Sequence, residues 1–160
     1  MRLSLWLAVS CAALISPVAQ AAPGDVSIER GRQVSIIGGC NDCHTSGYNE
    51  SQGKIDPPKA LAGTAIGWMG PWGTTYPANI RLKVKDMTED AFVQYAKTFT
   101  ARPPMPYYNV QAMDESDLRS LYLYIKSLGA PGDAMPDYVP PGQEPKTPYY
   151  VAAPPTMPKS

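Results

Sequence analysis

Histidine is scarce in this chain, because His44 is the only one among 160 residues. With a single histidine, one chain cannot form a catalytic site or a metal centre that needs two imidazoles. Charge of one sign is not in excess either, since 14 basic residues face 14 acidic ones. A nucleic-acid-binding protein needs surplus lysine and arginine to neutralise phosphates, so no nucleic-acid partner is expected. The sequence also lacks P-loop, HExxH and nucleophile-elbow motifs, which argues against hydrolysis and phosphoryl transfer.

Residues 1–21 are predicted to be a signal peptide rather than part of the fold. A positive start at Met1-Arg2 precedes an apolar run from Leu3 to Ile15, and Ala19-Gln20-Ala21 supplies the small residues of a cleavage site. A membrane-spanning helix needs about 20 apolar residues, and this run is shorter. We therefore expect export, cleavage after Ala21, a periplasmic location and no membrane span in the mature protein.

The two cysteines that remain after cleavage lie together in Cys40-Asn41-Asp42-Cys43-His44. This C-x-x-C-H spacing is that of covalent c-type haem attachment. It lets both sulfur atoms reach one edge of the porphyrin, while the following imidazole turns onto the iron. A structural zinc site needs four nitrogen or sulfur ligands, and the mature chain offers three. A thioredoxin-like redox pair needs a βαβ context, which the pattern lacks. The predicted cofactor is therefore one covalent haem c with its iron, ligated by His44.

The sixth iron ligand is sought among the methionines, since no second histidine exists. Met87 and Met113 each precede a helix N-cap, where a hydrophobic staple explains them. Met105 lies in Arg102-Pro103-Pro104-Met105-Pro106, and the prolines fix this segment as a stiff extended loop. We therefore predict Met105 as the ligand, with Met69, Met113 and an open site as the alternatives. Histidine–methionine ligation suits electron transfer because it raises the haem potential and closes the iron to small ligands.

Three segments resemble class I c-type cytochromes. They are Gly31-Arg32-Gln33-Val34 with the haem motif after it, residues 70–80 (GPWGTTYPANI), and Pro104-Met105-Pro106-Tyr107 with Asp114-Glu115-Ser116-Asp117-Leu118 after it. The second and third are similar to haem domains in the cytochrome subunits of periplasmic alcohol and gluconate dehydrogenases, which typically carry several such domains in tandem. The resemblance covers about residues 24–130. It implies the class I fold, in which the first and last helices cross behind the haem.

The expected fold is all-α: three main helices wrapped around one haem, in a domain of residues 22–130 with long loops. Asp25 is expected to cap a first helix over residues 26–37, and further helices are expected over residues 89–99 and 115–128. The last has a clear apolar stripe, formed by Leu118, Leu121, Tyr122, Ile125 and Leu128. Gly31 weakens a helix by about 1 kcal/mol relative to alanine, which is tolerated where another helix comes close.

Residues 45–79 show no periodicity and are expected to form a long loop around the haem, which would itself fill the core. Trp72, Tyr76 and Asn79 in this region are candidate donors to the haem propionates, and ordinary aromatic packing is the alternative. Arg81, Lys83 and Lys85 alternate with apolar residues. That alternation predicts a short extended segment with a solvated face, or else a basic docking patch for an acidic redox partner.

Residues 131–160 form a proline-rich extended tail, in which nine of the 18 prolines lie. The sequence leaves three arrangements open for such a segment: it is disordered, it lies across the haem domain, or it docks to a partner. Both predicted ligands precede it, so truncation after Ala130 is expected to leave the haem spectrum nearly unchanged.

These features predict a periplasmic monohaem c-type cytochrome, which is an electron carrier and not itself an enzyme. Its expected partners are redox proteins: a dehydrogenase or quinol-oxidising complex as donor, and an acceptor such as an oxidase. The alternative is a haem-bearing subunit of a periplasmic dehydrogenase complex. A peroxidase or ligand sensor is disfavoured, because no second histidine is available for the distal side.

Overall fold

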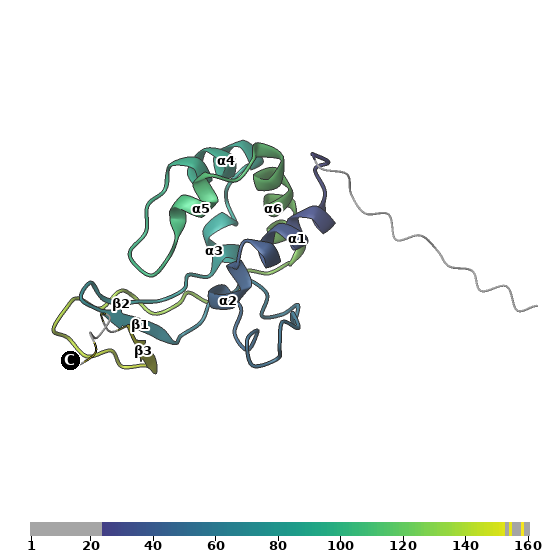
Figure 1. Ribbon diagram of the computed structural model, residues 1–160. Coiled ribbons are helices and arrows are strands. Elements are labelled where there is room, and N and C mark those ends of the chain that lie inside the picture. Colours follow the sequence, from purple (N-terminus) through teal and green to yellow (C-terminus); the bar gives the residue numbers. More distant parts are fainter. Residues whose placement is uncertain (1–23, 153, 155–157, 159–160) are drawn as a thin grey trace, which may run out of the picture.

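The computed structural model describes residues 24–152, 154 and 158, and the predicted signal peptide lies outside them. The helices are α1 (Ile28–Ile37), α2 (Cys40–His44), α3 (Ile80–Val84), α4 (Glu89–Thr98), α5 (Tyr107–Gln111) and α6 (Glu115–Ser127). Three short strands, β1 (Gly67–Gly70), β2 (Gly73–Thr75) and β3 (Tyr149–Val151), form one sheet. Figure 1 shows most of the helices gathered together, with the sheet set to one side of them. None of the helices within these residues is both long and apolar enough to cross a membrane.

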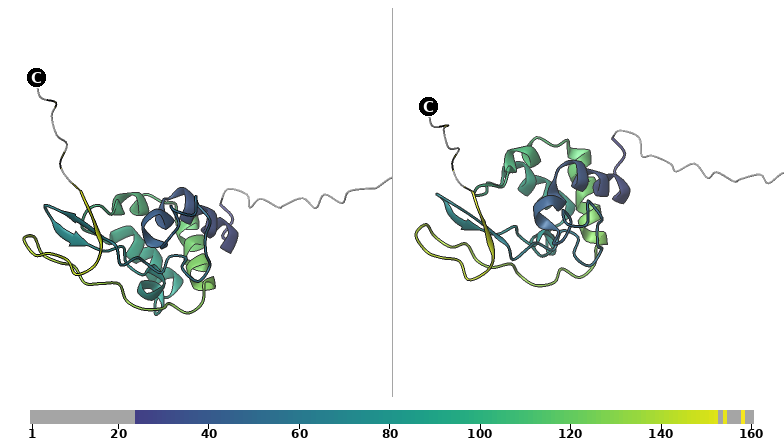
Figure 2. Two further views of the ribbon diagram at one scale, coloured as in Figure 1. Left: turned by 90° about the horizontal axis from the view of Figure 1, so that it is seen from below. Right: turned by 60° about the horizontal axis from the view of Figure 1, so that its bottom comes forward.

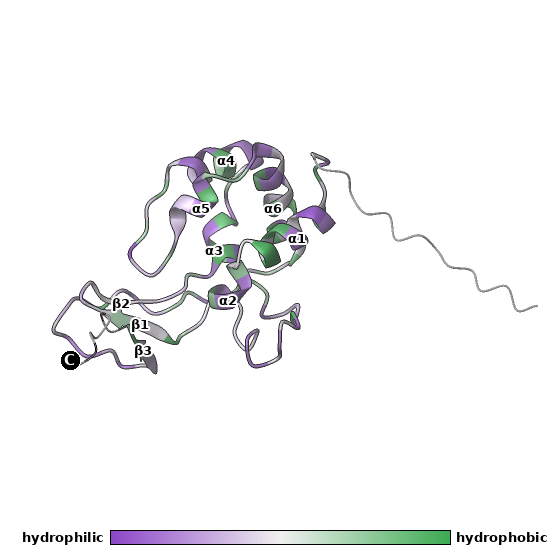
Figure 3. Cartoon of the chain, in the orientation of Figure 1, coloured by the Kyte–Doolittle hydropathy of each residue, from purple (hydrophilic) through white to green (hydrophobic). Residues whose placement is uncertain are grey.

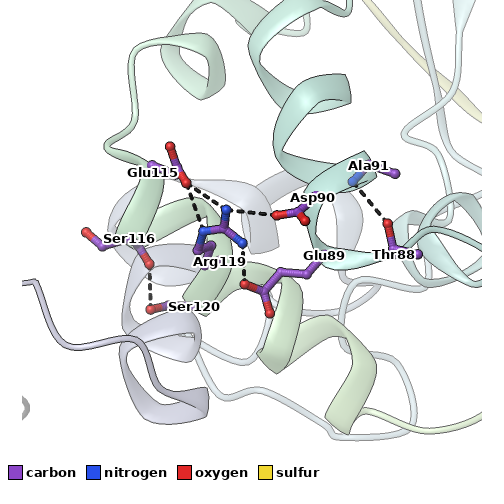
Figure 4. Close-up of polar contacts among 8 residues, drawn as sticks. All are labelled: Thr88, Glu89, Asp90, Ala91, Glu115, Ser116, Arg119 and Ser120. Carbon is purple, nitrogen blue, oxygen red and sulfur yellow. Dashed lines mark hydrogen bonds and ion pairs between the residues drawn. The ribbon is translucent and has the colours of Figure 1, made fainter.

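The three expected helices are present as α1, α4 and α6, with ends close to those predicted. Helix α1 begins later than expected because Ser27, not Asp25, is its N-cap: the Ser27 hydroxyl accepts a hydrogen bond from the Arg30 amide at 3.1 Å. The Thr88 hydroxyl caps α4 in the same way by accepting from the Ala91 amide (Figure 4). Hydrophobic and hydrophilic segments alternate along these helices (Figure 3), as expected of helices with one buried face.

Helices α1 and α6 cross in close contact at Gly31. A Cβ atom on Gly31 would lie 1.9 Å from the Ser120 backbone oxygen and 2.8 Å from the Tyr124 Cβ atom. Arg30 joins the same two helices through two hydrogen bonds to the Asp117 carboxylate, at 2.7 and 2.9 Å. The close helix approach predicted from Gly31 is confirmed, and so is its partner, the last helix.

Helix α4 packs against α6 beside this crossing and completes the core. The buried apolar side chains include Val34, Leu61, Val84, Phe92, Val93, Ala96, Leu118, Leu121 and Ile125. At the edge of this core, Arg119 of α6 binds Glu89 and Asp90 of α4 and Glu115 of its own helix (Figure 4), with distances of 2.6, 2.9 and 2.7 Å. The guanidinium group therefore ties the first turn of α4 to the first turns of α6.

The sheet corrects the all-α expectation, because the domain is mostly helical but not entirely so. Strand β1 pairs antiparallel with β2 across a tight turn, and it pairs parallel with β3, where Trp68 lies opposite Tyr150. The strands are three or four residues long, too short for an alternating pattern to be recognised in the sequence. The third strand also comes from the tail, so its pairing depends on contacts distant in sequence.

The tail lies across the domain over residues 131–152, which is one of the three arrangements that the sequence left open. The Thr74 and Val139 backbones exchange two hydrogen bonds, at 2.8 and 3.0 Å. The Asn79 side-chain amide donates to the backbone oxygens of Pro131 and Asp133, at 2.6 and 2.9 Å. Figure 2 shows the tail leaving α6 and running to the sheet in both views.

Residues 80–84 form helix α3, which corrects the expected extended segment. Asn79 starts this helix, because its side-chain oxygen accepts a hydrogen bond from the Leu82 amide at 2.9 Å. Arg81 is 7% exposed, and its guanidinium group donates to three backbone oxygens, those of Pro58, Leu128 and Ala130. Arg81 is therefore a structural residue at the start of the tail, and it is not available to a docking partner.

Candidate functional site

A cavity of about 520 Å³ lies where the helices, the β1–β2 hairpin and the tail meet. Five of the residues predicted for the site line it: Cys40, Cys43, His44, Tyr76 and Met105. The sequence places these residues in three separate segments, and folding brings them to one cavity. Its volume lies in the usual range for a cofactor site.

Helix α2 sets the two cysteines and the histidine on one side of the cavity. Residues three and four apart share a helix face, so Cys43 and His44 lie on the same side as Cys40. Asn41, on the other face, is buried: it donates to the Ser35 backbone oxygen and accepts from the Thr45 hydroxyl. These bonds fix α2 against the end of α1.

The tautomer of His44 follows from its hydrogen bond to the Ala78 backbone oxygen, 2.7 Å from Nδ1. A carbonyl oxygen only accepts, so Nδ1 carries the proton and the lone pair resides on Nε2. Burial lowers the pKa of His44, and the hydrogen bond to Ala78 opposes that shift in part. The imidazole is therefore neutral near pH 7, which is the form that ligates a metal.

The cysteine thiols are not bonded to each other. Burial raises the pKa of Cys40 to about 11, and burial also raises the pKa of Cys43, with a contribution from the Asp42 carboxylate. A redox-active pair needs the opposite, since a lowered pKa makes the reactive thiolate. The protein surroundings therefore do not prepare these thiols for disulfide exchange.

Met105 lies on the loop between α4 and α5 and lines the same cavity. Among the methionines that the structure describes, Met105 alone lines this space. Met87 and Met113 pack against the hydrophobic core instead, as expected for residues that precede helix N-caps. Met69 lies within strand β1 and contributes to a separate groove beside the tail. The geometry therefore favours Met105 over both of its alternatives.

The remaining walls of the cavity are apolar and aromatic, and two cations lie on them. The apolar and aromatic members include Leu61, Trp68, Val84, Phe92, Leu121, Ile125 and Tyr138. Lys83 and Arg102 also line the cavity, while no acidic residue does so within the described part of the chain. Neither cation takes part in an ion pair with another described residue. A flat apolar macrocycle that bears two carboxylates and a metal fits these walls, so the residues present fit haem c.

Trp72 and Asn79, predicted to contact the propionates, do not line the cavity. Asn79 caps α3, and its amide group donates to two tail carbonyls, so both of its N–H bonds already have acceptors. The Trp72 indole packs against Gly70, and its backbone oxygen accepts a hydrogen bond from the Tyr138 hydroxyl at 2.8 Å.

Sequence reasoning missed Arg102, Lys83 and Tyr138 as lining residues. The position of Arg102, three residues before Met105 in the same proline-rich loop, was a usable signal. Tyr138 gave none, because it lies in a tail without periodicity. Tyr138 and Pro136 of the tail both line the cavity. We therefore no longer expect the tail to be dispensable for the haem environment.

Comparison with known proteins identifies the family. Residues 28–129 match the family model described as cytochrome c. The chain belongs to the cytochrome c family. Membership implies haem c as the cofactor and electron transfer as the role of the domain. This cytochrome is similar to one of the nicotinate dehydrogenase subunits of Pseudomonas putida, with 29% identity over 126 residues that cover 71% of this chain and 10% of the relative. It thus spans about a tenth of that relative's length. No solved structure matches the chain.

Proposed function

We propose that this protein is a monohaem c-type cytochrome that carries single electrons between exported redox proteins. The observation that carries the proposal is the convergence of Cys40, Cys43, His44 and Met105 on one apolar cavity. In this proposal, Cys40 and Cys43 form the thioether bonds to haem. His44 would hold the iron through Nε2, and Met105 would hold it through its thioether sulfur.

Bound haem c supplies an iron that alternates between the ferrous and ferric states. The chain determines how that iron is held. The Ala78 backbone oxygen fixes the His44 tautomer and orients the ring through Nδ1. Apolar walls limit the access of water, and Lys83 and Arg102 place positive charge where haem carboxylates would be stabilised. An apolar site that would hold the iron through His44 and Met105 suits electron transfer better than oxygen chemistry.

Export and partners complete the proposal. Residues 1–21 act as a signal peptide that is cleaved after Ala21, and the mature cytochrome works in the periplasm. It accepts electrons from a dehydrogenase or quinol-oxidising complex and passes them to an acceptor such as an oxidase, without itself catalysing substrate oxidation.

A second candidate role is that of an electron-transfer subunit within a dehydrogenase complex. The similarity to the nicotinate dehydrogenase subunit of P. putida favours it. Size-exclusion chromatography of the native protein from its own cells separates the two roles. Co-elution with a larger catalytic chain supports the role within a complex, and elution as a small single protein supports the free carrier.

Mass spectrometry of the denatured mature protein tests the attachment. We expect the mass of residues 22–160 plus one haem that stays bound after denaturation. A matched variant with Cys40→Ser and Cys43→Ser should lose this covalent haem, because the oxygen of serine does not form the thioether. A wild-type mass equal to that of the apo-protein with a Cys40–Cys43 disulfide would contradict the cytochrome proposal.

A further inference from the structure

The loop that carries Met105 is held from outside the helical core at two points. We call residues 100–106, between α4 and α5, the methionine loop. The Thr75 hydroxyl of strand β2 donates a hydrogen bond to the Pro103 backbone oxygen at 2.8 Å. The Arg102 guanidinium group lies 3.9 Å from the centroid of the Tyr138 ring, which comes from the tail. In Figure 1 the loop extends from α4 and α5 toward the hairpin.

Both points of support are themselves fixed. The Tyr138 hydroxyl donates to the Trp72 backbone oxygen, and the next residue, Val139, exchanges two backbone hydrogen bonds with Thr74. Gly73 lets the tail approach this closely: a Cβ atom there would lie 2.4 Å from the Val139 oxygen and 3.0 Å from the Tyr138 hydroxyl. The hairpin and the tail therefore form one platform under the methionine loop.

The methionine loop has little of its own to hold it in place. Its backbone hydrogen bonds are short-range, from the Met105 amide to the Arg102 oxygen and from the Tyr107 amide to the Met105 oxygen. Pro103, in the middle of the loop, is exposed and does not line the cavity, so burial contributes little to fixing it. A segment with few buried contacts opens readily unless something external restrains it.

We propose that Thr75 and Tyr138 are positioning residues that keep Met105 in its place as the sixth ligand. The inference rests on the proposed function, because it requires Met105 to ligate the iron. The sheet and the tail thereby determine how readily the sixth ligand gives way to an external one. Removing either contact raises the fraction of molecules whose loop is open, and an external ligand then binds more tightly in proportion to that fraction.

Imidazole is the probe, titrated into the oxidised holo-protein while the sulfur-to-iron charge-transfer band is followed. Thr75→Val removes the hydrogen bond at constant shape, and Tyr138→Leu removes the ring beneath Arg102. Each should tighten imidazole binding by about five- to tenfold, the effect of losing roughly one hydrogen bond or stacking contact. Thr88→Val is the matched control, because it removes the hydroxyl that caps α4 but no contact of the loop. It should leave imidazole affinity unchanged while lowering the denaturation midpoint.

A double-mutant cycle isolates the stacking contact. Arg102→Leu and Tyr138→Leu should each tighten imidazole binding, and the double variant should bind no tighter than either one. Additive effects would mean that the two side chains act separately. Tyr138→Phe keeps the ring on which Arg102 stacks, and the Thr74–Val139 backbone pair still holds that ring in place, so it should bind imidazole nearly as the wild type does. If Tyr138→Leu does not fold, Arg102→Leu tests the same stacking contact.

The outcomes separate this inference from the proposed function. If Met105→Ala leaves the charge-transfer band in place, the proposed ligand set is wrong. If Met105→Ala abolishes the band but Thr75→Val and Tyr138→Leu bind imidazole as the wild type does, the positioning role alone is refuted. An equal increase in affinity in Thr88→Val would also refute it, because the effect would then follow global stability.

Discussion

Replacing Gly31 by alanine tests the helix crossing on which the site rests. In an isolated helix the change stabilises by about 1 kcal/mol, because glycine is a poor helix former. In the folded protein, the added Cβ atom would lie 1.9 Å from the Ser120 backbone oxygen and 2.5 Å from its carbonyl carbon. That carbonyl belongs to the backbone of α6 and cannot rotate away. Helices α1 and α6 must therefore separate by roughly 1 Å or more to restore ordinary contact.

The separation has a cost that exceeds the gain in helix propensity. It disrupts the Arg30–Asp117 pair and the hydrogen bond from the Ser27 amide to the Ser120 hydroxyl, along with the packing around Val34. Overpacking against side chains costs about 1–3 kcal/mol, and contact with backbone lies at the upper end. We expect the free energy of unfolding to fall by about 3 kcal/mol. For a domain of this size, that lowers Tm by about 12 °C.

Thermal and urea unfolding of the holo-protein, followed by circular dichroism, measure this effect. Gly38→Ala is the control, since its Cβ atom would meet the flexible end of Met113 at 2.9 Å and the Val34 oxygen at 2.9 Å. The end of Met113 can move, and the contact with the Val34 backbone oxygen is far less severe than the 1.9 Å contact at Gly31, so Gly38→Ala should cost clearly less than Gly31→Ala. A Gly31→Ala protein as stable as the wild type, or more stable, would refute the close crossing.

Three further predictions concern the ligand, the tail and Arg81. Met105→Ala should lower the reduction potential, abolish the sulfur-to-iron charge-transfer band and let carbon monoxide bind. Met113→Ala should keep the band and lose about 1 kcal/mol of stability. The reverse pattern would contradict our assignment. Truncation after Ala130 removes Pro136 and Tyr138 from the cavity lining, so it should perturb the haem spectrum and tighten imidazole binding; an unchanged spectrum would show that the tail is dispensable. Arg81→Met leaves three carbonyl oxygens without their donor, so it should lower the free energy of unfolding in urea titrations by about 3 kcal/mol and keep the charge-transfer band. A loss of stability under about 1 kcal/mol would contradict the structural role of Arg81.

The helices and the haem motif could be predicted because their signals are local. Cys40, Cys43 and His44 lie within five residues, so about one turn of helix brings them to the same face. The stripe on α6 and the polar residue Thr88 before α4 are likewise complete within a few residues. Met105 could be preferred by elimination over Met87 and Met113, which precede helix N-caps, whereas the position of Met69 in strand β1 is known only from the structure.

The sheet, the path of the tail and the place of Lys83 in the cavity lining could not be predicted, because they depend on partners distant in sequence. Alternation predicts a solvated Arg81, yet its guanidinium group donates to three carbonyl oxygens from two segments distant in sequence. The polarity of Asn79 suggests a haem contact, whereas its hydrogen bonds go to α3 and the tail. The register of β3 against β1 follows from the path of the whole tail, and nothing within Tyr149–Val151 specifies it.

The sequence by itself determined the chemistry of this protein: a covalent haem motif, one possible histidine ligand and the helices that enclose them. These are short-range properties, set by residue type and by spacing within a turn or two of helix. Only the tertiary structure decided what surrounds that chemistry, including the hydrogen bond from His44 to Ala78, the cations of the cavity and the Thr75 and Tyr138 contacts to the methionine loop. Such contacts join segments that meet only when the chain closes on itself, so no local pattern encodes them.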